Sequence, residues 1–229
     1  MTAMSTTPAL GWSAMVKRGL TRDTLVTIAH EYVADNGLDA LTMRRLAAAA
    51  EVTPGALYKH FQDRKDLQRA MADAIYATID LSDIDPTAAS VEQVKTCCER
   101  MRHAMLSFRD GGRIIAGSYA PLTATLALST TLMTLLQAVT KPERSAGQLA
   151  ALLRSYTTGF VVDEQSFLEL KTSNEWDSLV QQIADSAHPR PAGADDLIAL
   201  LTGDRDQRFN TGLDMILTGL TRSAPARSD

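Results

Sequence analysis

Five basic side chains gather in one short stretch of the chain, where they could bind the phosphates and bases of a nucleic acid. Between residues 42 and 65 only Glu51 and Asp63 oppose them. The whole chain, in contrast, holds 23 Lys and Arg against 27 Asp and Glu, and its net charge of −4 argues against a general nucleic-acid binder. The five residues are Arg44, Arg45, Lys59, Arg64 and Lys65.

The charge is also divided unevenly along the chain. Residues 1–70 hold nine basic and seven acidic side chains, a balance of +2, whereas the remainder holds 14 and 20, a balance of −6. Because DNA attracts a basic module and repels an acidic body, this division suits contact with DNA at one defined face.

Short helices must position this basic module. Apolar residues recur at helical spacing from Leu25 to Val33, where Thr21 can cap the helix and Asn36-Gly37 supplies a left-handed stop. These features predict a first helix directly ahead of the basic stretch.

The next two helices are short and lie close together. One begins after Thr42 and ends near Ala50, and the other begins at Thr53, with Pro54 at its first position, and reaches Phe61. Two such helices joined by a three-residue turn predict a helix-turn-helix, whose second helix enters the major groove of DNA. The expected inward residues are Leu46, Val52, Leu57 and Phe61, with Ala47 and Ala50 where the helices cross.

Polar residues on the outward face of the second helix are the candidates for DNA contact. The free N–H groups and the positive dipole end of that helix also favour phosphate. A fourth helix, capped by Asp63, begins with Arg64 and Lys65, which could hold the flanking backbone. The outward residues are Thr53, Gly55, Tyr58, Lys59 and His60.

Residues 41–67 closely resemble the DNA-binding domain of the tetracycline-repressor (TetR) family; they read LTMRRLAAAAEVTPGALYKHFQDRKDL. The resemblance spans roughly residues 21–75 and implies a homodimeric transcription regulator, usually a repressor that a small molecule releases from operator DNA. Carried over by position, Arg44 resembles a base-reading arginine and Arg64 a contact to backbone phosphate. The implied DNA-binding residues are Thr42, Arg44, Thr53, Pro54, Gly55, Tyr58, Lys59, His60 and Arg64.

Glu51 departs from the family pattern, which usually has a glycine in a left-handed turn at this position. We therefore expect Glu51 to adopt that conformation at a cost of about 1–2 kcal/mol.

The rest of the chain predicts further helices, at about 91–109, 119–138, 145–170 and 205–222. Residues 171–194 are interpreted as a long, partly ordered connection, and Asp110-Gly111-Gly112 as a turn. We expect an all-α fold, with a three-helix DNA-binding domain and a larger helical domain for ligand binding and dimerisation. The expected divisions are 1–20 (flexible arm), 21–68 (helix-turn-helix domain), 69–222 (ligand-binding and dimerisation domain) and 223–229 (loose tail).

Residues 108–118 and 156–165 are similar to two segments of the ligand-binding domain of the tetracycline repressors themselves. In those proteins the first segment supplies a histidine that binds the magnesium of a metal–drug chelate. The matching residue here is Ile115, which cannot ligate a metal, and the acidic residue of the second segment corresponds to Asp163 or Glu164, with little to pair with. We predict no metal, no cofactor and no response to magnesium-tetracycline.

The ligand pocket is expected to hold a small apolar or aromatic effector. Met101, Met105 and Met133 could line an adaptable apolar wall, or could belong to the core. Plain core packing is an equally good interpretation of each aromatic candidate. The candidates are His103, Phe108, Ile115, Tyr119, Tyr156 and Phe160.

Two long helices carry broad apolar faces that predict a homodimer through residues 145–170 and 205–222. Two helices from each subunit would form a four-helix bundle; the alternative is a monomer in which both faces are buried internally. The apolar residues are Leu149, Leu152, Leu153, Tyr156 and Phe160 in the first and Phe209, Leu213, Ile216 and Leu220 in the second.

Other classes of protein are less consistent with the sequence. It contains no nucleophile elbow, phosphate-binding loop or paired His/Cys metal spacing, which argues against an enzyme. No run of 18 apolar residues and no signal-like start occurs, so we expect a cytoplasmic protein with no membrane span. Cys97 and Cys98 are expected to be reduced and buried. The alternative function is a ligand-binding helical dimer with weak or effector-dependent DNA binding.

Overall fold

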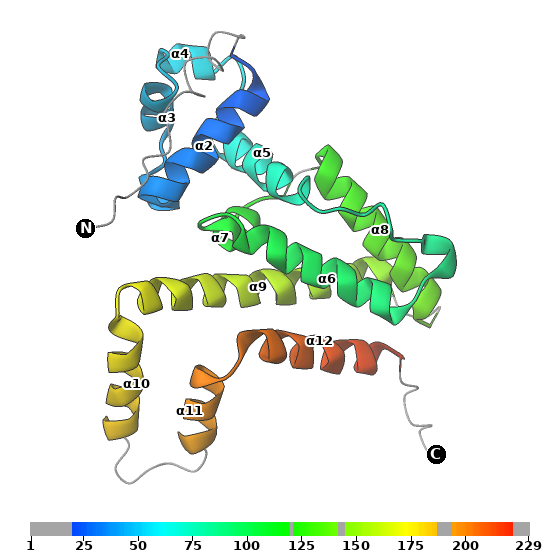
Figure 1. The fold of residues 1–229 in the computed structure, drawn as a ribbon. Helices are drawn as coiled ribbons and strands as arrows, with labels where there is room; N and C mark the ends of the chain where they lie inside the picture. Colours follow the sequence, from blue (N-terminus) through cyan, green and yellow to red (C-terminus); the bar gives the residue numbers. More distant parts are fainter. Residues whose placement is uncertain (1–19, 120, 142–144, 187–193, 222–229) are drawn as a thin grey trace, which may run out of the picture.

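The computed structural model describes residues 20–119, 121–141, 145–186 and 194–221, and within these ranges the chain is helical with no strand. A small head stands at one end of a larger helical body (Figure 1). The head comprises helices α2, α3 and α4, the short 3-10 turn η1 and the first half of α5, and the body comprises the rest. The predicted all-α architecture is confirmed.

The head forms as its caps and apolar spacing predict. Helix α2 spans Arg22–Asn36 and α3 spans Met43–Ala49, with η1 (Leu38–Ala40) between them. The hydroxyl groups of Thr21 and Thr42 cap α2 and α3, because each accepts a hydrogen bond from a backbone N–H three residues on. The predicted inward residues Leu46, Leu57, Phe61, Ala47 and Ala50 are buried, and Val52 is half-buried against them.

Helix α4 is shorter than the sequence predicts. It spans Pro54–Leu57, and the residues up to Phe61 form turns in which the N–H groups of His60 and Phe61 both donate to the Leu57 carbonyl. Thr53 takes the N-cap position, but its hydroxyl makes no capping hydrogen bond. The third helix of the predicted motif is therefore a single turn.

Helix α5 (Arg64–Tyr76) belongs to both parts of the molecule. It begins where Asp63 accepts a hydrogen bond from the Asp66 N–H at 2.7 Å. Its buried face, which includes Leu67, Met71 and Ile75, runs without interruption from the core of the head into the body. The expected domain division after residue 68 thus falls within a continuous helix.

The body is built around one long helix. Helix α9 (Ala146–Thr172) packs against α6 (Val91–Leu106), α7 (Gly111–Ala116), α8 (Thr123–Val139) and α12 (Arg205–Thr221). A short turn, η2 (Pro86–Ala88), precedes α6. The four long helices predicted for this region are confirmed, although α8 begins at Thr123 and not at 119; the other ends agree to within a few residues.

Two interpretations of the body were wrong. Asp110-Gly111-Gly112 is not a simple turn: Asp110 is left-handed, with φ of 58°, and takes the N-cap position of an additional helix, α7, without a side-chain capping hydrogen bond. Gly111 is required there because a Cβ would overlap the carbonyl oxygen of Met105. The change of direction between α6 and α7 is thus built into these residues.

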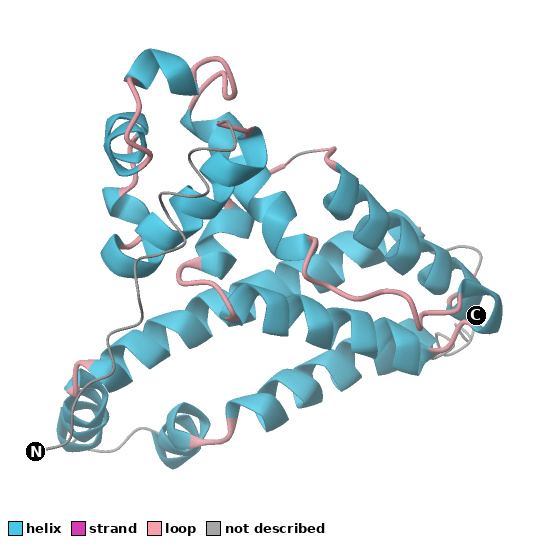
Figure 2. Cartoon of the chain, turned by 45° about the horizontal axis from the view of Figure 1, so that its top comes forward, coloured by secondary structure: helices cyan, strands magenta, loops and turns pink. Residues whose placement is uncertain are grey.

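The predicted connection at 171–194 instead contains helix α10 (Glu175–Ser186), and α11 (Ala194–Thr202) follows. Helix α10 turns away from the end of α9, and α11 returns beside it (Figures 1 and 2). Trp176 anchors α10, since its ring meets that of Phe167 edge-on at 4.7 Å between centroids. Residues 187–193, 1–19 and 222–229, which include the expected arm and tail, lie outside the described residues. No helix of the described chain is long and apolar enough to cross a membrane.

Glu51 adopts the left-handed conformation expected of it, with φ of 56°. Replacing it with glycine removes the steric cost of that conformation, in part offset by the greater flexibility of glycine in the unfolded chain. We expect Glu51→Gly to stabilise the protein by about 1 kcal/mol, which raises the thermal midpoint by about 2–4 °C. Ala48→Gly, on the exposed side of neighbouring α3, is the control and should lower the midpoint. An unchanged midpoint in Glu51→Gly would contradict the assigned turn strain.

Candidate nucleic-acid interface and ligand cavity

The outward face of the helix-turn-helix is polar and open. Tyr58 and Lys59 are exposed, as is Thr53 at the start of α4. A Cβ placed on Gly55 would meet nothing within 4 Å, so another molecule can approach the backbone closely at that point. Since Leu57 holds the opposite side of α4 in the core, these four residues share a fixed, solvent-facing surface.

The remaining candidates surround this surface. Arg44 projects from α3 and is exposed. Thr42 is exposed, but its hydroxyl already caps α3. His60 is half-buried, and its backbone carbonyl accepts a hydrogen bond from Arg22. Arg64 donates from Nε to the Leu41 carbonyl at 3.0 Å, so its guanidinium is held against the backbone that precedes α3.

Arg22 fixes the end of the motif to the rest of the head. Its guanidinium forms an ion pair with Asp66 at 2.7 Å and lies 4.5 Å from the ring centroid of Phe61. The hydrogen bond from Arg22 is the main cause that lowers the pKa of Asp66. The turn after α4 is therefore held by both charge and packing.

The six predicted pocket residues do not line one cavity. His103 is exposed on α6, and Tyr119 is 78% exposed. Ile115 lies in the core, and Phe108 packs against the ring of His30. The pair Tyr156 and Phe160 packs against Phe209 of α12.

A different set of residues lines a cavity of about 180 Å³ between α5, α6, α8 and α9. Its walls are mostly apolar, and Met101 and Met133 are among them, as one interpretation of the methionines predicted. Tyr76 and Arg154 are its ionisable groups. Sequence reasoning missed both, although each is a polar residue on a helix face that is otherwise apolar. The lining residues are Tyr76, Met101, Leu128, Ser129, Leu132, Met133, Gly147, Ala150, Ala151 and Arg154.

Glu164 was expected to have little to pair with, and this was wrong. Its carboxylate accepts two hydrogen bonds from Arg102, at 2.8 Å and 2.6 Å, and both side chains are buried. Arg102 also reaches Asp206 of α12 at 2.6 Å. Burial alone would lower the pKa of Arg102, but the hydrogen bonds that it donates to Glu164 and Asp206 and the charges of these carboxylates together raise it.

The residues at this position do not fit a magnesium site. Ile115 offers no donor atom, and Glu164 is engaged by Arg102. Among the described residues, no group of three or more His, Cys, Asp or Glu side chains is placed to hold a metal ion. Cys97 and Cys98 are free and buried, as expected, and burial raises the pKa of these thiols to about 11 and about 12.

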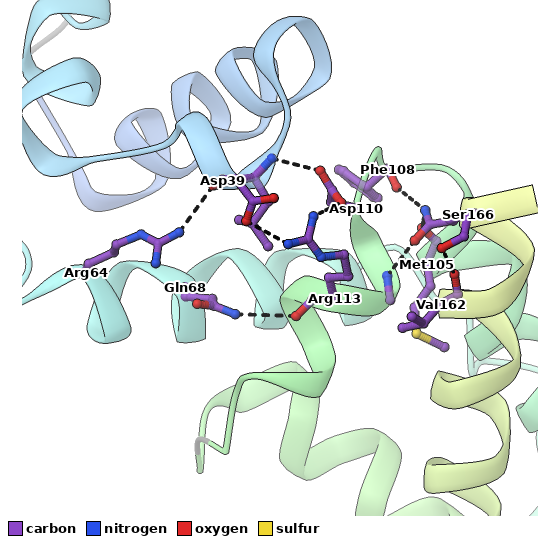
Figure 3. Close-up of polar contacts among 12 residues, drawn as sticks. Asp39, Arg64, Gln68, Met105, Phe108, Asp110, Arg113, Val162 and Ser166 are labelled. Carbon is purple, nitrogen blue, oxygen red and sulfur yellow. Dashed lines mark hydrogen bonds and ion pairs between the residues drawn. The ribbon is translucent and has the colours of Figure 1, made fainter. Parts of the chain in front are cut away.

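A polar network joins the head to helix α7 (Figure 3). Arg113 forms ion pairs with Asp39 of η1 at 2.7 Å and with Asp110 at 2.8 Å. Asp110 also accepts a hydrogen bond from the backbone N–H of Leu38 at 2.8 Å. Gln68 of α5 donates to the Ile114 carbonyl at 3.1 Å, which ties the connecting helix to the same element.

Comparison with known proteins decides the family. A family profile described as "Tetracyclin repressor-like, C-terminal domain" matches residues 86–223, and one described as "Bacterial regulatory proteins, tetR family" matches residues 25–71. The chain belongs to the TetR family. The resemblance read from the helix-turn-helix therefore extends through the body, and the TetR architecture of a DNA-binding head and a ligand-binding body applies to it.

Individual TetR relatives cover nearly the whole chain. The tetracycline repressor protein class C of Escherichia coli is 29% identical over 92% of this chain and 94% of its own length. The structure is similar to ActR of Streptomyces coelicolor in complex with actinorhodin, at 26% identity and a TM-score of 0.73, covering 88% of this chain and 97% of ActR. It is also similar to BioQ bound to its double-stranded DNA operator, at 27% identity and a TM-score of 0.64, covering 89% of this chain and 99% of BioQ.

His30 provides a test of the contact between the TetR head and body. Its ring lies 4.6 Å from that of Phe108, its Nε2 is 3.1 Å from the Met71 carbonyl oxygen, and burial lowers its pKa below 6.5. The folded protein therefore binds this proton less readily than the unfolded chain does, so stability falls as the pH drops below about 6.5. The loss cannot exceed about 1.4 kcal/mol per pH unit for one proton.

We expect His30→Gln to reduce this pH dependence, measured as the free energy of unfolding by denaturant between pH 5 and pH 8. His103→Gln removes an exposed histidine from α6 and should leave the profile unchanged. Equal profiles for wild type and His30→Gln would show that His30 does not carry the effect.

Proposed function

We propose that the protein is a homodimeric repressor that binds a palindromic DNA operator through its two heads and is released by a small molecule bound in the body. The observation that carries this proposal is the exposed polar face of the helix-turn-helix, with Arg44 and Lys59 beside the open backbone of Gly55. Two heads related by a two-fold axis would enter successive major grooves, one helical turn or more apart.

The proposed contacts follow from exposure and chemistry. Arg44 presents a fork of donors that can read a guanine edge, whereas Lys59 is a flexible point charge suited to phosphate. The hydroxyl of Tyr58 can donate to a phosphate oxygen. Thr42 and Arg64 would act partly through the backbone that they hold in place. The proposed DNA-binding residues remain Thr42, Arg44, Thr53, Pro54, Gly55, Tyr58, Lys59, His60 and Arg64.

Dimerisation is proposed through α9 and α12, within the predicted ranges 145–170 and 205–222. Leu153, Phe209 and Leu213 are buried between these helices inside one subunit, so they are not available to a partner. The apolar surface left open on the same helices includes Leu152, 47% exposed, and Met215, 70% exposed. A second copy of the chain would cover these side chains.

Release is proposed to act through α5. The helix carries Gln68, which contacts α7, and Asp73, whose carboxylate accepts a hydrogen bond from the Thr125 N–H of α8 at 2.7 Å. It ends at Tyr76, in the wall of the cavity. A ligand that binds more tightly when α5 is shifted would therefore favour a head spacing that does not fit the operator.

Magnesium-tetracycline is not the proposed effector, because Ile115 and the paired Glu164 leave no metal ligands at the matching positions. Nor do we propose catalysis, since the cavity holds no nucleophile paired with a base. A protein that binds operator DNA works where the chromosome is, so we place it in the cytoplasm.

Selection of duplexes from a random DNA pool, at about 50 and 200 mM salt, tests the proposal. We expect a palindromic motif that Arg44→Ala binds more weakly by about 1–3 kcal/mol, with relaxed base preference. Lys59→Ala should weaken binding to all DNA sequences alike and reduce the salt dependence of the affinity by about one phosphate contact. Lys171→Ala, on the far end of α9, removes the same charge and should leave binding unchanged.

Binding without sequence preference would contradict the operator proposal. No binding without effector would favour the ligand-binding dimer whose DNA affinity depends on its effector. If Arg44→Ala lowers the affinity for all DNA sequences equally, Arg44 contacts phosphate and not a base.

The dimer proposal has its own test. Leu152→Glu and Met215→Glu place charges on the open faces of α9 and α12, and we expect each to shift sedimentation from dimer to monomer without lowering helical content. Ala48→Glu, on the exposed side of α3, is the control and should remain dimeric. A wild-type protein that sediments as a monomer at micromolar concentration would refute the proposal.

A further inference from the structure

The cavity contains a buried donor without a partner. Tyr76 is only 5% exposed, and its hydroxyl makes no hydrogen bond in the described part of the chain. Burial raises the pKa of Tyr76 to about 12, with the charge of Arg154 opposing the rise, so the group is a neutral hydroxyl at physiological pH. A buried hydroxyl without an acceptor costs free energy, which a ligand oxygen would recover.

The cavity also contains a cation without an acidic partner. Arg154 is half-buried on α9, and no Asp or Glu of the described residues forms an ion pair with it. Its guanidinium lies 5.0 Å from the ring centroid of Tyr119 and close enough to the Tyr76 hydroxyl to lower the pKa of that hydroxyl, so Arg154 and Tyr76 can both donate to one anion. Arg102 in the same domain differs, because Glu164 and Asp206 neutralise it.

The rest of the wall determines the size and polarity of the ligand. Leu128, Leu132, Met101 and Met133 supply apolar surface, and the hydroxyl of Ser129 is already used by the Thr125 carbonyl at 2.7 Å. A cavity of about 180 Å³ is smaller than the sites that hold drug-sized molecules, about 300–1,000 Å³. This volume favours a single ring or a short apolar chain.

We propose that the cavity binds a small apolar carboxylic acid, whose carboxylate pairs with Arg154 and accepts a hydrogen bond from Tyr76, while its ring or chain packs between the methionines and leucines. The proposal rests on the proposed function, since it names the chemical class of the effector. The hydrogen bond from Tyr76 would also connect the effector to the last residue of α5, the helix that leads to the head.

Direct binding tests the ligand class without DNA. Benzoate, phenylacetate and cinnamate would each be titrated into the full-length protein by calorimetry, beside the matching neutral carboxamide. We expect each acid to bind at least about tenfold more tightly than its amide, because only the acid forms a charge-assisted pair. Arg154→Gln should remove this preference, and Tyr76→Phe should weaken the acids several-fold while leaving the amides nearly unchanged.

Lys171→Gln removes a positive charge from the same helix far from the cavity and should retain the preference. Thermal unfolding of each variant confirms that it is folded. Amides that bind as well as acids, acids that bind Arg154→Gln as well as wild type, or no binding of any probe would overturn the ligand class. The operator selection above is independent of these probes, so either proposal can fail while the other holds.

Discussion

The continuity of helix α5 is the constraint on which the rest of the structure depends. A helix transmits displacement along its axis because each turn is fixed to the next by backbone hydrogen bonds. Leu67 anchors one end in the core of the head, and Tyr76 ends the helix in the wall of the cavity. Head and body therefore cannot move independently without bending α5 or breaking its side contacts, and the proposed release by a ligand in the body depends on this coupling.

The contacts beside α5 can favour one arrangement over another. Asp110 holds a left-handed backbone, accepts the buried N–H of Leu38 and pairs with Arg113, so one residue sets the start of α7 and binds the head. Moving the head away would break the hydrogen bond from the buried N–H of Leu38 to Asp110 and the ion pair between Arg113 and Asp39, at a cost of about 1–3 kcal/mol. This cost lies in the usual range of coupling free energies between two sites. A small ligand can supply it.

The head was predictable from sequence because its information is local. The Thr42 cap, Pro54 and short apolar intervals determine where α3 and α4 lie, whereas the left-handed Glu51 was expected from the resemblance to the TetR family. The cavity was not predictable from sequence, because the long helices carry apolar residues on several faces. Helical periodicity does not show which neighbouring helix each face contacts. Tyr156 illustrates this: it points to α12, where its hydroxyl donates to the Phe209 carbonyl, and not into the cavity. Helix α10 could have been found from the helical spacing of Trp176, Leu179 and Val180.

Arg102 and Arg154 in the body differ in burial and in ion pairing, and this difference distinguishes an arginine that stabilises the fold from one that is available to a ligand. Arg102 is almost completely buried and is neutralised by two carboxylates, an arrangement that would be strongly destabilised by loss of one partner. A metal could recruit Glu164 only by breaking that pair, so the polar centre of the body is closed to ligands. Arg154 has no such carboxylate among the described residues and lies near the unsatisfied hydroxyl of Tyr76 in a mostly apolar cavity. The free energy still available for binding an anion therefore lies at Arg154, next to the helix that positions the head.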